Sequence, residues 1–210
     1  MRISYLHLLI ATWTILVIAA CKKNDQSLGD VSLKSTEFPL AVGDKWVYQV
    51  NDYNSNTSDT ITLAITGSQS LPGNTTSYRC DITIHGAVVD SGTWLADGKI
   101  FTYQGLNPNS YSYFGNIKLQ FPCTTGGNWP GIYPTDTVRL ISRIDSTAIL
   151  GREYHPVFSL RRSFQLQGNY SQVQNVLIAP NIGIINQSLD IFSGGPLQNQ
   201  GFSLISWSLR

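Results

Sequence analysis

The fold of this chain is decided by the stretch Thr60-Ile61-Thr62-Leu63-Ala64-Ile65, in which every second residue is large and apolar. A period of two places Ile61, Leu63 and Ile65 on one face of an extended strand. The residues between them are small or polar and suit the opposite, solvated face. The stretch therefore predicts a β-strand that buries only one of its two faces.

The same alternation recurs along the chain between segments rich in turn-forming residues. Leu71-Pro72-Gly73-Asn74 predicts a turn, and Asp97-Gly98 predicts a tight type I′ hairpin because glycine tolerates positive φ. We expect no amphipathic helix longer than two turns. The predicted strands span residues 46–50, 60–65, 78–84, 94–95, 100–103, 117–121, 137–144, 153–161, 172–178 and 202–209.

The composition agrees with an all-β fold. Charged residues make up 13% of the chain, and glutamate occurs only at Glu37 and Glu153. Short polar residues fill the remaining polar positions, and they favour turns and strands because they compete with a helix for backbone hydrogen bonds. With turns roughly every 8–12 residues, the pattern predicts a meandering antiparallel sheet, a sandwich or a barrel.

One motif occurs twice in the chain. Residues 38–46 and 121–129 both read F-P-x-x-x-G-x-x-W, at an offset of 83 residues. Proline fixes φ, glycine permits a turn, and tryptophan then begins a strand and fills the core. We interpret the motif as a repeated strand start. The alternative is a pair of aromatic ligand sites.

The first 21 residues predict where in the cell the protein is located. An almost purely apolar run from Leu8 to Ala20 ends in small residues directly before Cys21. The run is shorter than the roughly 20 apolar residues of a membrane span. It resembles a bacterial lipoprotein signal, in which the cysteine is acylated and becomes the mature N-terminus. An N-terminal membrane anchor that stays in place is the alternative.

We therefore expect three segments. Residues 1–20 are a signal peptide, residues 21–36 are a polar, flexible tether, and residues 37–210 form a single β domain. Removal of the signal takes Arg2 with it and leaves thirteen basic and thirteen acidic side chains, so the mature formal charge is zero. Nucleic acid is not expected as a partner, because phosphate binding needs a basic surface. The expected partner is a membrane, reached through lipidated Cys21.

Three further segments resemble a group of known proteins. Residues 38–48 follow the pattern F-P-L-x-V-G-x-x-W-x-Y, residues 179–185 are similar to an A-P-G-V-G-L-V segment with Asn181 at one glycine, and residues 204–209 resemble a closing strand. All three are typical of an uncharacterised secreted lipoprotein family of Bacteroidetes-type bacteria. The resemblance implies an antiparallel, strongly curved, half-barrel-like sheet without an agreed activity. A β-sandwich with two F-P-x-x-x-G-x-x-W strand starts stays open beside it.

The resemblance also concerns location. Lys22, Lys23 and Asp25 follow the cysteine and are similar to the export tag that sends such lipoproteins to the outer surface. This implies an outer membrane lipoprotein. Whether the domain faces the periplasm or the cell surface is left open.

Cys80 and Cys123 remain in the mature chain. In an oxidising envelope they can form a disulfide. The alternative is two separate buried thiols, because free cysteine packs as a small apolar residue. The mature histidines, His85 and His155, lie at no ligand spacing from a cysteine, so we expect no metal and no cofactor.

No catalytic residue is assigned. The chain has no G-x-S-x-G elbow, and a serine triad would have to use His85 or His155. Turn capping explains most of the aspartates, as at Asp97. We therefore expect no enzyme, with a hydrolase using His155 as the weakest alternative.

A binding module is expected instead. One loop dense in aromatic and amide side chains contains Tyr111, Tyr113 and Phe114, and a second contains Trp129 and Tyr133. Flat rings beside amides suit a sugar face or a protein partner, because they offer a large apolar area at low entropy cost. The expected partners are a glycan, a lipid or an envelope protein. A carrier of lipid or another hydrophobic ligand is the alternative, and it follows from the half-barrel resemblance alone.

Overall fold

The computed structural model describes residues 32–105, 115–165, 170–193 and 196–210. Most of these residues lie in strands joined by short turns. The elements are η1 (Ser35–Glu37), β1 (Lys45–Asp52), β2 (Thr57–Leu71), β3 (Thr75–Ile84), β4 (Ala87–Ala96), β5 (Ile100–Gly105), β6 (Ile117–Gln120), β7 (Asn128–Pro130), β8 (Thr137–Ile144), β9 (Thr147–Ile149), β10 (Arg152–Tyr154), β11 (Val157–Gln165), β12 (Tyr170–Ala179), β13 (Gly183–Ser193) and β14 (Pro196–Ser208).

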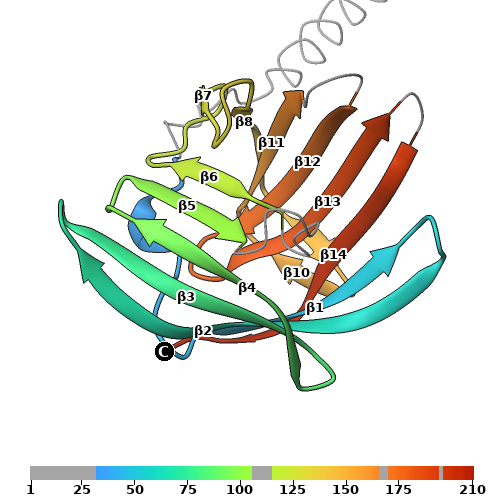
Figure 1. The fold of residues 1–210 in the computed structure, drawn as a ribbon. Coiled ribbons are helices and arrows are strands. Elements are labelled where there is room, and N and C mark those ends of the chain that lie inside the picture. Colours follow the sequence, from blue (N-terminus) through green and yellow to red (C-terminus); the bar gives the residue numbers. More distant parts are fainter. Residues whose placement is uncertain (1–31, 106–114, 166–169, 194–195) are drawn as a thin grey trace, which may run out of the picture. The chain divides into compact units, whose positions relative to one another are not determined.

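Twelve strands form one sheet in the order β6-β5-β4-β3-β2-β1-β14-β13-β12-β11-β8-β7, while β9 and β10 pair as a separate hairpin. Among the described residues, every pairing between these strands is antiparallel. Figure 1 shows the large sheet curling strongly. The predicted all-β, antiparallel, strongly curved fold is confirmed, and the sandwich alternative is wrong because one sheet holds all the long strands. In the described part of the chain, no helix has the length and apolar character needed to cross a membrane.

The core lies on the inner face of the sheet. Ile61, Leu63 and Ile65 are at most 3% exposed, while Thr62 and Ala64 between them are partly exposed. The strand pattern read from this stretch is therefore confirmed. On β1, Trp46 and Tyr48 point to the same interior.

The two copies of the F-P-x-x-x-G-x-x-W motif form the same turn. Gly43 and Gly126 both have positive φ, 99° and 80°. The Gly43 N–H donates to Ile65 O, whose own N–H donates to Asp44 O. The second copy repeats this reciprocal pair between residues 126–127 and Leu140. The packing interpretation of the motif is confirmed, because both tryptophans that follow are buried.

One predicted turn has a different geometry. A type I′ turn needs positive φ at both central residues, but only Gly98 of Asp97-Gly98 has it. The predicted type is therefore wrong, since the Asp97 carboxylate accepts from the N–H groups of Lys99 and Ile100 and sets an Asx turn instead. His85-Gly86, with φ of 50° and 80°, meets the type I′ requirement between β3 and β4.

The packed chain includes residues ahead of the predicted domain start at 37. Leu33 is fully buried and forms an isolated antiparallel bridge with Cys123. Leu33 and Cys123 exchange both of their backbone hydrogen bonds, at 3.1 and 2.9 Å. Leu33, in the segment before β1, is thus part of the core.

The sheet consists of two six-stranded meanders. One runs outward from β1 to β6, and the other runs from β7 through β8 and β11–β13 to β14, which pairs with β1. The edge strands are β6 and β7. We call the contact between β6 and the β7–β8 end of the second meander the seam. Side chains bridge it, as the Trp129 indole N–H does by donating to Lys118 O at 2.8 Å.

Candidate functional site

The five aromatic residues predicted to contact a ligand have different outcomes. Three of them, Tyr111, Tyr113 and Phe114, lie outside the described residues. Trp129 is 6% exposed, with its ring in the core and its N–H bonded to Lys118 O. A buried ring with a satisfied N–H offers no ligand surface, so packing replaces the predicted role of Trp129.

Tyr133 stays at the surface, with 41% of the residue exposed. Its hydroxyl oxygen accepts a hydrogen bond from Asn116 Nδ2 at 2.9 Å. Its ring lies 5.3 Å from that of Phe164, centroid to centroid. The structure thus joins Tyr133 to the end of the first predicted aromatic loop across the seam.

Cys80 and Cys123 are free thiols, and both are fully buried. The candidate disulfide is therefore not formed, and the alternative of two separate thiols is the one observed. Burial raises the pKa of Cys80 far above its ordinary value and raises the pKa of Cys123 to about 12. Because the thiolate is the reactive form, neither residue is suited to act as a nucleophile near neutral pH.

The two histidines lie beside carboxylates on the surface. His85 Nε2 is 3.3 Å from Asp59 Oδ1, and His155 Nε2 is 3.7 Å from Glu153 Oε2. All four side chains are at least 46% exposed. Water competes for such pairs, so they lack the fixed geometry that catalysis needs. Among the described residues, no cluster of three His, Cys, Asp or Glu side chains could hold a metal ion.

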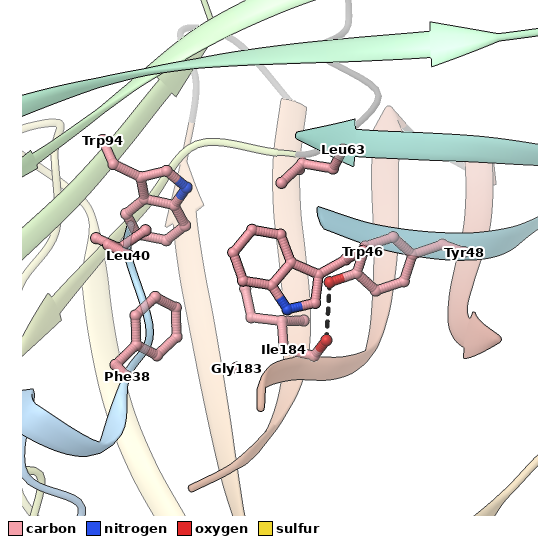
Figure 2. Close-up of a pocket in the computed structure, with 8 residues that line it drawn as sticks. All are labelled: Phe38, Leu40, Trp46, Tyr48, Leu63, Trp94, Gly183 and Ile184. Atoms are coloured by element: carbon pink, nitrogen blue, oxygen red, sulfur yellow. Dashed lines mark hydrogen bonds between the residues drawn. The ribbon is translucent and has the colours of Figure 1, made fainter. Parts of the chain in front are cut away.

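An apolar hollow lies between the segment before β1 and the inner face of the sheet (Figure 2). Its free space is about 10 Å³, close to what one water molecule needs. Phe38 and Trp94 meet at its wall with ring centroids 5.3 Å apart. The residues that line it are Phe38, Leu40, Trp46, Tyr48, Leu63, Trp94, Gly183 and Ile184.

Two polar groups at the hollow are already bonded within the protein. The Tyr48 hydroxyl donates to Ile184 O at 2.8 Å, as Figure 2 shows, and the Trp46 indole N–H donates to Ile182 O at 2.6 Å. Burial raises the pKa of Tyr48 well above its ordinary value and keeps the phenol neutral. The hollow therefore presents an apolar wall, and both bonds tie β1 to the chain around the start of β13.

A buried ion pair lies near the seam. Arg162 on β11 donates from Nε to both carboxylate oxygens of Asp136, at 2.9 and 2.8 Å, and the two side chains are 2% and 0% exposed. Arg162 Nη1 also donates to Asn116 O at 2.6 Å, and Gln174 Nε2 donates to Gly115 O at 3.4 Å. These side chains satisfy carbonyl groups just before the edge strand β6. The ion pair compensates the charge of Arg162, and its further hydrogen bonds link β11 to the residues before β6.

The outer face of the sheet carries residues that the sequence interpretation missed. Tyr53 lies in the turn between β1 and β2, in a stretch rich in Asn, Ser and Asp, and is 61% exposed. Amide and hydroxyl side chains extend from it across neighbouring strands, as Asn51 and Ser188 do. The available signal was a single aromatic residue among Asn, Ser and Asp. Its surroundings come from strand pairing, which local sequence does not show.

No protein-family model matches the sequence, and no curated protein matches it. Among solved structures, the chain is similar to a "putative exported protein with YmcC-like fold" from Bacteroides fragilis NCTC 9343, with a TM-score of 0.48 and 10% identity. It is also similar to a "putative lipoprotein" from Parabacteroides distasonis ATCC 8503, with a TM-score of 0.46 and 10% identity. Each of these likenesses covers 85% of this chain and 100% of the other.

A weaker likeness links the chain to a "putative outer membrane lipoprotein-sorting protein domain" from Vibrio parahaemolyticus. The TM-score is 0.27 and the identity 9%, over 82% of this chain and 87% of the other. All three likenesses are distant, and the function is therefore argued from the residues of this chain.

Proposed function

We propose that this chain is a cell-envelope lipoprotein of the secreted Bacteroidetes-type family it resembles, with a non-catalytic binding domain. The support for the anchor is the apolar run from Leu8 to Ala20, which ends in small residues directly before Cys21. In this proposal residues 1–20 are removed and lipidated Cys21 enters the outer membrane. The tether ends before Leu33, which is packed into the domain.

The small size of the apolar hollow favours a binding module over a carrier of hydrophobic ligands. Sites that enclose small molecules measure about 300–1,000 Å³, whereas this hollow has about 10 Å³ of free space. Its polar neighbours Trp46 and Tyr48 are bonded within the protein. The hollow is therefore a packing gap, and ligand contact belongs to the surface of the domain.

The non-catalytic character of the domain has separate support. The thiols of Cys80 and Cys123 are buried and held neutral. His85 and His155 stand in solvent, where their carboxylate partners are poorly held.

Labelling with a radioactive fatty acid tests the anchor. Cells producing the wild-type chain are expected to incorporate the label into it, whereas cells producing Cys21→Ser are not. Cys80→Ala is the matched control and is expected to label like the wild type, because its thiol is buried inside the domain. Equal labelling of wild type and Cys21→Ser would overturn the proposed anchor.

Lipid extraction tests the binding module against the carrier. The full chain, purified in detergent and exchanged into fresh detergent, is expected to release no stoichiometric lipid on solvent extraction. The covalent anchor on Cys21 stays with the protein in this procedure. One equivalent of extracted lipid per chain would favour the carrier and contradict the module.

A further inference from the structure

Uncharged polar residues form two rows on the outer face of the sheet, one across β12, β13, β14, β1 and β2 and a shorter one across β13, β14, β1 and β2, which meets Leu177 on β12. Figure 1 shows these five strands side by side. Directly paired residues in an antiparallel sheet share a face. The first row is Asn175, Ser188, Gly201, Asn51 and Ser58. The second row is Asn186, Ser203, Gln49 and Thr60. Their strand neighbours Val176, Phe202 and Val50 are buried on the inner face.

Hydrogen bonds hold the side chains of these rows in place. Asn175 Nδ2 donates to Ser188 Oγ at 3.1 Å, and Asn186 Nδ2 donates to Ser203 Oγ at 3.0 Å. Gln49 Nε2 donates to Ser58 Oγ at 3.1 Å. An amide offers two N–H donors and a carbonyl acceptor. The Asn175 and Asn186 amides therefore have capacity for further hydrogen bonds beyond these pairs.

Tyr53 rises over the first row. Its hydroxyl oxygen is 2.7 Å, and its Cε2 atom 3.0 Å, from the position that a Cβ atom on Gly201 would take. The Tyr53 N–H donates to Asn199 O at 3.0 Å, which fixes the residue against β14. A Cβ atom at position 201 would require the Tyr53 ring to shift from this place, and Tyr53 is nonetheless 61% exposed. An open aromatic ring thus stands beside an array of amides and hydroxyls.

We propose that this face binds a neutral glycan chain, with a sugar ring stacked on Tyr53 and sugar hydroxyls bonded to the two polar rows. This proposal rests on the proposed function as a binding module. No residue in either row carries a charge, and the nearest charges on this face are Arg161, which continues the first row on β11, and Asp190, which borders it on β13. The uncharged rows match an uncharged ligand and contain no cation to pair with a phosphate. Tyr53 is the exposed ring beside the two rows, and the next exposed ring, Phe192, lies near the far end of β13. Protein partners usually need a larger continuous apolar centre. Five strands at about 4.8 Å spacing span roughly 20 Å, enough for a short oligosaccharide.

Affinity electrophoresis of the full chain in detergent tests the proposal. The gels contain one of four soluble neutral polysaccharides: a β-glucan, a xylan, a galactomannan or dextran. We expect at least one polymer to retard the wild type. Tyr53→Ala is expected to weaken that retardation about tenfold, the effect of losing one good stacking contact. Tyr53→Phe keeps the ring over Gly201 and is expected to stay within about threefold of the wild type.

Two further variants keep the test independent of folding defects. Asn175→Ala removes an exposed amide two strands away from Gly201 in the first row and is expected to weaken retardation without changing the unfolding midpoint. Tyr133→Ala removes the exposed ring near the seam and is expected to change nothing. Retardation by none of the four polymers, or loss with Tyr133→Ala in place of Tyr53→Ala, overturns the glycan face. Both failures are separable from failure of the proposed function, because fatty acid labelling and lipid extraction do not depend on Tyr53.

Discussion

Arg162 is one of the largest side chains that are fully buried among the described residues. Its charge is compensated by Asp136, and its guanidinium also lies 4.4 Å from the centre of the Phe164 ring. Removing one partner of a buried ion pair leaves the other charged in a medium of low polarity. Arg162 therefore links β11 both to Asp136 and to the backbone of Asn116, just before β6.

We expect Arg162→Leu to lower the free energy of unfolding by about 3–5 kcal/mol, because Asp136 is left buried without its partner. Urea denaturation of wild type and variant measures the difference. The control is Arg79→Ala, which removes a 65% exposed side chain from its pair with Asp81. This control is expected to lose no more than about 1 kcal/mol, and an equal loss in both variants would contradict the interpretation.

Asp97 makes folding sensitive to acid. Hydrogen bonds from the N–H groups of Ile100 and Lys99 hold its pKa below the usual value. A lowered folded-state pKa adds stability above the unfolded-state value of about 3.9, and this stability is lost as the pH falls through the folded-state pKa. Asp97→Asn keeps an acceptor oxygen without titrating. Urea denaturation between about pH 4 and pH 2 should therefore show a shallower loss of stability for the variant, and parallel curves would contradict this.

At the scale of elements, two strand glycines have opposite surroundings. A Cβ atom on Gly92 in β4 would overlap the Tyr103 ring, which leans across from β5, whereas a Cβ atom on Gly67 in β2 would meet nothing within 4 Å. We expect Gly92→Ala to destabilise the protein by about 1–3 kcal/mol through overpacking. Gly67→Ala is expected to be neutral or to stabilise by up to about 1 kcal/mol. Thermal unfolding of both variants measures this, and equal midpoints would count against the ring contact.

Strand positions could be read from local sequence wherever alternation is unbroken. The predicted strand at 137–144 coincides with β8. The predicted strand at 153–161 is in fact two strands, β10 and β11, because His155-Pro156 separates them. The alternation also fails to predict β13, since Ile184 and Ile185 are both buried beside a register shift and Gln187 occupies a buried position. Because the period of two is interrupted, local sequence does not predict β13, although pairing with β12 and β14 keeps it in the sheet.

At the scale of the whole molecule, the repeated motif marks how the sheet is built. One copy precedes β1 and the other precedes β7, so each copy begins one six-stranded meander. The sequence shows the repeat, but it does not show that the meanders join at β1 and β14. The surface around Tyr53 depends on that junction, because Asn51 and Gly201 become neighbours only there. The candidate site could therefore not be assembled from local pattern.

The seam should respond to loss of a single side-chain hydrogen bond. Trp129→Phe keeps a ring but removes the N–H that Lys118 O accepts, so we expect a loss of about 1–3 kcal/mol. Hydrogen exchange measured by mass spectrometry should speed up in β6. Trp46→Phe removes the equivalent N–H in the first motif, which bonds Ile182 O, and should leave β6 exchange less affected. Equal acceleration of β6 in both variants would contradict a local role for Trp129 at the seam.

The two buried thiols have a practical consequence. Cys80 lies in the middle of the first meander, whereas Cys123 lies between the meanders and contacts Leu33. A thiol in either place must reach solvent and ionise before an alkylating reagent can modify it. Its modification rate therefore records how often its own surroundings open. The alkylation rate of Cys80 thus reports how often the first meander opens, and the alkylation rate of Cys123 reports how often the junction between the two meanders opens.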